Sequence, residues 1–120
     1  MASRPLSVHE ADRQGDHVIL RLEGELAGQF WTEVIQDYLE DHYVDDGVKR
    51  IRIDLSSVSF IDSYGVATLI ALYKESRQKK KHFSVEGAQG QVLEKLKTTG
   101  VRSVLEEGGG GAGSGGGSPA

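Results

Sequence analysis

The chain has 120 residues, a formal net charge of −4 and no cysteine. This length allows one domain, and the lack of cysteine excludes disulfide bonds, thiolate metal sites and a cysteine nucleophile. The sequence contains no run of about 18 apolar residues, so no membrane span is expected. The acidic balance argues against a nucleic-acid-binding surface, and a cytoplasmic location without a cofactor is expected.

Composition divides the chain into three segments. Residues 107–120 are dominated by glycine, serine and alanine, which cannot bury enough apolar surface to offset chain entropy. They are expected to form a flexible tail. Residues 1–6 are expected to be an N-terminal arm, and residues 7–106 a single folded domain.

The sequence of the first part of the domain predicts two strands and a helix. Residues 7–11 and 17–22 are expected to pair as a hairpin, because residues 14–16 favour a turn. After Gly24, apolar residues at spacings of one, three and four predict a helix with one apolar face. The residues expected on that face are Phe30, Trp31, Val34, Ile35, Tyr38 and Leu39.

Residues 49–55 alternate apolar and polar side chains, which predicts a strand with one buried face. A short loop is expected at residues 56–57, followed by the apolar segment 58–61. A second helix is predicted after Gly65. Its expected apolar face consists of Val66, Leu69, Ile70 and Tyr73, with Ala67 and Ala71 alongside.

The last part of the domain predicts a strand at residues 83–85, a helix at residues 91–99 and a strand or extended segment at residues 101–105. The element order is then ββαβαβαβ. Strands that alternate with helices indicate an α/β fold with a mixed, mainly parallel sheet and helices packed against it. The first strand is expected to be antiparallel at one edge.

The polar pair Asp62 and Ser63 stands between an apolar strand and an apolar helix. One interpretation is helix capping by either side chain. The other is that Ser63 lies exposed where sites of parallel α/β folds collect. A phosphate there would add about −1.5 to −2 charges, favoured by the helix dipole and repelled by Asp62. Gly65 would let a partner's backbone approach.

A hydrolytic serine is not expected. Such a nucleophile needs a base within hydrogen-bond reach and a third group that orients the base. The Gly-x-Ser-x-Gly motif is absent, because Ile61 occupies the position of its first glycine. The four histidines are scattered over predicted strand ends and a helix end, and the acidic cluster at residues 41–46 lacks calcium-ligand spacing. The sequence therefore favours binding over catalysis, without a metal site.

Several segments between residues 7 and 105 form a pattern. They are Gly24-Glu25-Leu26, Ile51-Arg52-Ile53-Asp54-Leu55, Val58, Phe60-Ile61-Asp62-Ser63, Gly65-Val66 and Lys97-Thr98-Thr99-Gly100-Val101. Together they resemble the STAS-domain family, in particular bacterial anti-sigma-factor antagonists. The most specific piece is Asp-Ser-x-Gly placed after an apolar-Asp-apolar strand. The resemblance implies a mixed sheet with helices packed against it.

The resemblance also implies a mechanism called partner switching. An unphosphorylated antagonist binds an anti-sigma factor that is itself an ATP-using serine kinase, and the sigma factor is released. The kinase phosphorylates the serine that matches Ser63, the complex dissociates, and a serine phosphatase resets it. The implied partner surface contains Gly24, Leu26, Ala27, Asp62, Ser63, Tyr64 and Gly65.

Two positions differ from the family pattern. Tyr64 stands where relatives usually have a small residue, and Ala27 stands where many have Asp or Thr. Both indicate a changed partner surface and leave a second interpretation open. The chain would then be a STAS subunit that is not phosphorylated, in a lipid-transport ABC complex or a stress-sensing scaffold. Acceptance of phosphate by Ser63 distinguishes the two.

Overall fold

The computed structural model describes residues 6–43 and 47–101. Within these residues the chain forms seven elements in the order ββαβαβα. They are β1 (Ser7–Gln14), β2 (His17–Leu26), α1 (Trp31–Tyr43), β3 (Arg50–Ile61), α2 (Ser63–Gln78), β4 (His82–Glu86) and α3 (Gly90–Thr99). The final strand expected at residues 101–105 lies outside the described residues, apart from Val101, which has no regular structure.

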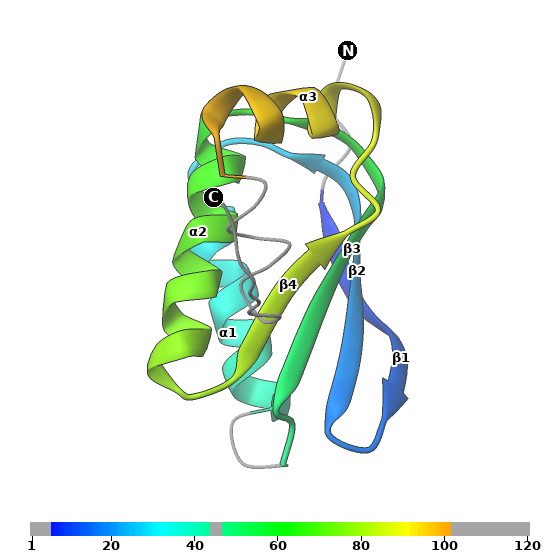
Figure 1. Ribbon diagram of the computed structural model, residues 1–120, viewed down its shortest axis with the longest axis vertical. Coiled ribbons are helices and arrows are strands. Elements are labelled where there is room, and N and C mark those ends of the chain that lie inside the picture. Colours follow the sequence, from blue (N-terminus) through cyan, green and yellow to red (C-terminus); the bar gives the residue numbers. More distant parts are fainter. Residues whose placement is uncertain (1–5, 44–46, 102–120) are drawn as a thin grey trace.

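The strands form one sheet in the order β1-β2-β3-β4. β1 pairs with β2 in antiparallel fashion, and the β2–β3 and β3–β4 pairs are parallel. This confirms the predicted mixed, mainly parallel α/β architecture. Helices α1 and α2 lie on one side of the sheet, and α3 crosses the end at which β3 finishes (Figure 1). The carboxyl ends of β2 and β3 therefore meet the amino ends of α1 and α2 at one end of the domain.

The β2 strand supplies the centre of the core. Its burial alternates along all ten residues, as expected for a strand with helices on one face. Four of its apolar side chains, Val18, Leu20, Leu22 and Leu26, are completely buried. The opposite face carries the less buried side chains, and within the described residues no helix covers that face (Figure 1).

β3 is one continuous strand of 12 residues, so the prediction of a loop at residues 56–57 is wrong. The register of β3 against β2 shifts twice near this point, between Arg21 and Glu23 and again between Gly24 and Glu25. Such irregularities bend a strand and interrupt side-chain alternation without ending the strand. The two polar serines are therefore accommodated inside β3.

The predicted apolar face of α1 is only partly correct. Ile35 is buried and Trp31, Tyr38 and Leu39 pack against the core, but Phe30 is 77% exposed and Val34 is 46% exposed. Phe30 precedes the helix, which begins at Trp31. Val34 lies about 200° around the helix from Thr32, the residue that contacts α2. The side of α1 that faces α2 is polar at this point, and Val34 faces away from it.

The predicted face of α2 is confirmed at Val66 and Leu69, which are buried together with Leu72. Ile70 and Tyr73 pack at the edge of the core.

Across the described ranges, no helix combines the length and hydropathy needed to cross a membrane.

Candidate functional site

Asp62 caps the amino terminus of α2. Its backbone is extended, with φ −116° and ψ −171°, and its Oδ1 accepts a hydrogen bond of 2.8 Å from the Gly65 backbone N–H. The Asp62 carbonyl accepts the first helical bond, from Val66 N at 3.0 Å. Aspartate is a preferred residue here because its carboxylate satisfies an N–H group that has no partner in the helix. The capping interpretation is therefore confirmed for Asp62.

The second carboxylate oxygen of Asp62 holds the loop between β2 and α1. Its Oδ2 accepts a bond of 3.1 Å from the Gly28 backbone N–H, and Asp62 N donates to the Leu26 carbonyl at 3.4 Å. One side chain thus joins two segments that are far apart in the sequence. The sequence pattern contains no signal for this second role.

The same loop is fixed from its other side by α1. The indole N–H of Trp31 donates to the Ala27 carbonyl at 2.9 Å. Further along, the hydroxyls of Thr32 and Thr68 lie 2.7 Å apart and join α1 to α2, while Thr68 also donates to the Tyr64 carbonyl. These contacts hold the first turn of α1 against the second turn of α2.

Gly65 contacts the chain itself rather than a partner. It is buried, and a Cβ at this position would lie 2.1 Å from the Leu26 carbonyl oxygen and 2.6 Å from Ile61 Cγ1. The expectation that a partner's backbone approaches at the missing side chain is therefore corrected, since Leu26 occupies that place. Glycine is required so that the first turn of α2 can pack against the end of β2.

Gln91 of α3 supports the end of β3 just before the site. Its side-chain amide accepts a bond from Ile61 N at 3.0 Å and donates to the Ile61 carbonyl at 2.9 Å. The pair of bonds imitates a neighbouring strand and fixes the backbone next to Asp62. Sequence reasoning did not identify Gln91, because nothing near it in the chain marks the contact.

Ser63 is the first residue of α2, and it is exposed. Within the described residues its hydroxyl makes no hydrogen bond. A helix begins with four N–H groups that have no intrahelical partner; Asp62 engages the Gly65 N–H, and the Ser63 and Tyr64 N–H groups point toward the same end. The helix dipole makes this end favourable for negative charge. The site can therefore accept an anionic group on Ser63.

Two large apolar side chains close to Ser63 in the sequence are exposed. Phe60, three residues before it, is 40% exposed, and Tyr64, the next residue, is 52% exposed. The only other large hydrophobic side chains exposed in the described ranges are Phe30 and Val34 at the start of α1. Apolar periodicity had predicted Phe30 and Val34 as core residues.

The remaining residues expected on the partner surface are less accessible. Leu26 is completely buried, and Gly24 is a buried strand residue with φ +111°, whose carbonyl accepts a bond from the Ser59 hydroxyl. Ala27 is half-buried in the loop held by Asp62. Leu26 and Gly24 therefore shape the surface from beneath, whereas Ser63 and Tyr64 are available for contact.

Asp54, in the middle of β3, has a structural role. Its Oδ1 accepts a bond from Ser56 N at 2.9 Å, and its Oδ2 pairs with Arg21 Nε at 3.1 Å. Burial acts to raise the pKa of this carboxyl, but the bonds from Ser56 and Arg21 outweigh burial and hold the pKa below its usual value. The carboxylate stabilises the bend in β3 below the site.

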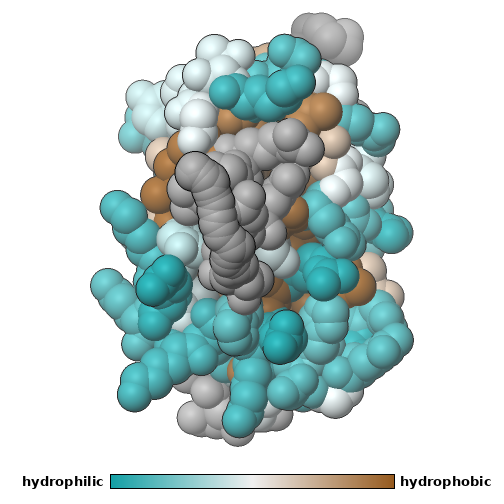
Figure 2. All heavy atoms as spheres, in the orientation of Figure 1, coloured by the Kyte–Doolittle hydropathy of each residue, from teal (hydrophilic) through white to brown (hydrophobic). Residues whose placement is uncertain are grey.

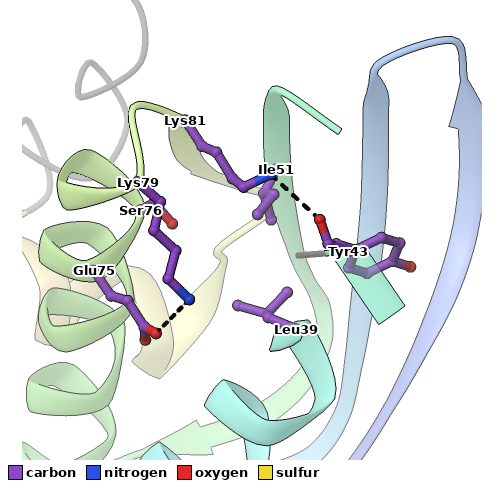
Figure 3. A pocket seen from close by; sticks show the side chains of 7 residues that line it. All are labelled: Leu39, Tyr43, Ile51, Glu75, Ser76, Lys79 and Lys81. Carbon is purple, nitrogen blue, oxygen red and sulfur yellow. Dashed lines mark hydrogen bonds and ion pairs between the residues drawn. The ribbon is translucent and has the colours of Figure 1, made fainter. Parts of the chain in front are cut away.

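A small pocket lies at the other end of the domain, between the last turns of α1 and α2 (Figure 3). Lys79 pairs there with Glu75 at 3.0 Å, which raises the Lys79 pKa despite partial burial, and Lys81 donates to the Val48 and Tyr43 carbonyls. The two ammonium groups of the pocket are thus engaged within the chain. The pocket is remote from Ser63.

The capped α2 helix, the exposed serine at its start and the four-stranded mixed sheet define a small α/β domain. The chain belongs to the STAS domain family, whose family model matches residues 9–107. It is 26% identical over 101 residues to the anti-sigma-B factor antagonists of Listeria monocytogenes and Listeria innocua, covering 84% of this chain and 87% of each relative.

Solved structures share the fold. The unphosphorylated anti-sigma factor antagonist SpoIIAA matches with a TM-score of 0.66 and 20% identity, covering 80% of this chain and 83% of that one. An anti-sigma factor antagonist from Mycobacterium paratuberculosis matches with a TM-score of 0.64 and 24% identity, covering 87% of both chains. The predicted STAS membership and α/β fold are therefore confirmed.

Proposed function

We propose that this chain is an anti-sigma factor antagonist that binds an anti-sigma factor with ATP-using serine kinase activity. In this proposal, phosphorylation of Ser63 by that kinase ends the binding, and a serine phosphatase restores it. Support comes from STAS family membership and from the names of the Listeria relatives. The chain would regulate transcription by binding, without a catalytic step of its own.

The observation that carries the proposal is the position of Ser63. Ser63 is exposed at the start of α2, next to the exposed Tyr64 in the sequence. A kinase can reach such a hydroxyl without unfolding the domain. The capping bonds of Asp62 are made by the neighbouring residue, so modification of Ser63 leaves the bonds to Gly65 and Gly28 in place.

The electrostatics of the site provide an off-switch. The dipole of α2 favours a phosphate on Ser63 by roughly 0.3–1 kcal/mol, so the free domain tolerates the modification. In a complex, the same dianion is desolvated by the partner beside the exposed Tyr64, and it adds negative charge next to Asp62 in the chain. A loss of about 3–4 kcal/mol weakens binding several hundredfold. Phosphorylation thus changes binding more than stability.

The proposal is tested with three baits in an extract of the source organism: the parent chain, Ser63→Ala and Ser63→Asp. The kinase retained by Ser63→Ala is then purified, and its affinity for each bait is measured by calorimetry. We expect Ser63→Ala to bind like the parent and Ser63→Asp to bind at least about a hundredfold more weakly. With ATP, the purified kinase should add one phosphate to the parent and none to Ser63→Ala.

Ser57→Asp is the matched control, because it adds the same charge at an exposed serine of β3. Ser57→Asp should bind the purified kinase more tightly than Ser63→Asp does. Equal binding by Ser63→Ala and Ser63→Asp, together with an unmodified Ser63, would contradict the switch. That outcome would favour a STAS subunit that is not phosphorylated, with Tyr64 blocking access of a kinase to Ser63.

A further inference from the structure

Three basic side chains lie side by side across the sheet, at the end opposite Ser63. Arg50, the first residue of β3, is paired with His17 of β2 on one side and with His82 of β4 on the other. Residues directly opposite each other on neighbouring strands point to the same face of a sheet. The three side chains therefore form one row, which we call the basic row.

The basic row lies on the face of the sheet that α1 and α2 leave open. The next residue of each strand, Val18, Ile51 or Phe83, is buried in the core, and alternation directs its predecessor to the opposite face. Arg50 and His82 are exposed, and His17 is half-buried. A ligand can therefore reach all three side chains from solvent.

Other charged side chains on this face have partners within the chain. Arg52 pairs with Glu86 at 3.4 Å, Arg21 pairs with Asp54 at 3.1 Å, and His9 lies 3.7 Å from Glu23. In the part of the chain that the structure describes, no carboxylate lies within ion-pair distance of any member of the basic row.

Two acidic residues lie close to His17 along the chain, Asp12 in β1 and Asp16 in the turn before β2. The Asp12 carboxylate accepts a bond of 3.2 Å from the Gln14 amide, and the Asp16 carbonyl accepts the backbone N–H of Arg50 at 3.0 Å. Hydrophilic side chains dominate this end of the visible face, where α2 finishes and β4 begins (Figure 2).

Basic groups directly opposite one another repel when charged, so an anion held between them would relieve the repulsion.

We propose that His17, Arg50 and His82 form a binding site for a phosphate-bearing ligand. A guanidinium group binds two phosphate oxygens at once, and each imidazole can donate a further hydrogen bond. Neighbouring strands lie about 4.8 Å apart, so the two histidines flank Arg50 over a span of roughly 10 Å. A phosphate or diphosphate centred on Arg50 fits this span. The site is separated from Ser63 by the length of β3 and does not depend on the proposed switch.

The test is a titration of the full chain with inorganic pyrophosphate, followed by NMR of the Arg50 guanidinium and the two imidazoles. We expect saturable shifts confined to the basic row and its neighbours. Arg50→Gln should weaken binding at least about tenfold, and the double variant His17→Gln, His82→Gln should weaken it severalfold. Arg52→Gln is the matched control on the same strand and face, and it should change binding less than about twofold.

A second arm identifies the source of the phosphate. Vesicles of two parts phosphatidylcholine to one part phosphatidic acid are tested by co-sedimentation with the parent chain and with Arg50→Gln. Binding of pyrophosphate alone supports a soluble ligand, and vesicle binding that is lost in Arg50→Gln supports a lipid headgroup. The proposal is overturned if neither probe binds saturably, or if Arg50→Gln and Arg52→Gln bind alike. Thermal unfolding of each variant shows that the exposed substitutions leave the fold intact.

Discussion

The Asp62 carboxylate accepts a hydrogen bond from the backbone N–H of Gly28, which lies 34 residues earlier in the chain, at 3.1 Å. The same carboxylate caps α2 through Gly65 at 2.8 Å. A single side chain thus sets the position of the β2–α1 loop relative to the helix that presents Ser63. The shape of the proposed partner surface therefore depends on both bonds.

Asp62→Ala should remove both bonds and lower the free energy of unfolding by about 1–2 kcal/mol. Hydrogen exchange at the Gly28 amide should become faster, because that amide loses its acceptor. Asp62→Asn keeps one acceptor oxygen and should lose less stability. Urea unfolding and amide exchange measure both effects. An unchanged Gly28 exchange rate in Asp62→Ala would show that the loop is held by other contacts.

Gly65→Ala should destabilise the domain by about 3 kcal/mol, because a Cβ would lie 2.1 Å from the Leu26 carbonyl oxygen. Gly15→Ala is the control. Gly15 has φ +61° but open space around its Cα, so only backbone strain of about 1 kcal/mol is expected there. Thermal and urea unfolding compare the two variants. Equal losses would show that α2 moves away from β2 at little cost.

The Arg21–Asp54 pair should make stability depend on pH. The pKa of Asp54 is lower in the folded state than its ordinary value of 3.8, so its contribution is present above that value and is lost as the pH falls through the folded pKa. Asp54→Asn should therefore cost about 1–2 kcal/mol at neutral pH, with the difference from the parent shrinking below about pH 4.

Asp37→Asn, which removes one charge at an exposed position of α1, is the control variant and should cost little stability at neutral pH. Urea unfolding across the acid range provides the measurement. The free energy of unfolding lost in Asp54→Asn could instead stay constant down to the acid limit. That result would mean that packing, rather than charge, explains the loss.

The Thr32–Thr68 bond can be isolated by a double-mutant cycle. Thr68 is 1% exposed, and Thr32→Val alone should cost about 1 kcal/mol because one hydroxyl loses its partner. The double variant Thr32→Val, Thr68→Val should cost less than the sum of the two single variants. Strict additivity in urea unfolding would show that the two hydroxyls are not coupled.

Element order and topology could be predicted because apolar periodicity and turn residues are local signals. Asp62 could also be predicted as a cap from its place between a strand and a helix. The exposure of Phe30 and Val34 could not be predicted from the sequence. Residue spacing shows that a helix has an apolar face, but it does not show which neighbouring element that face contacts. In the fold, Thr32 rather than Val34 faces α2.

The close contact of Gly65 with Leu26 depends on how β2 and α2 pack, so the sequence could not distinguish it from a partner's approach. The continuous β3 was missed for a related reason. Ser56 and Ser57 have the composition of a loop, but pairing with β2 keeps them extended through two register shifts. Local preference was overridden there by strand pairing with a distant segment.

Trp31 is the only tryptophan of the chain, and its indole donates to the carbonyl of Ala27, in the loop that Asp62 holds. The fold has therefore placed its one tryptophan, which can be excited selectively over the tyrosines, beside the proposed partner surface. Indole emission responds to solvent and to hydrogen bonding, so an event at Ser63 that disturbs the loop would change the emission wavelength or intensity. Association, phosphorylation and its reversal could then be followed in real time on the unlabelled protein.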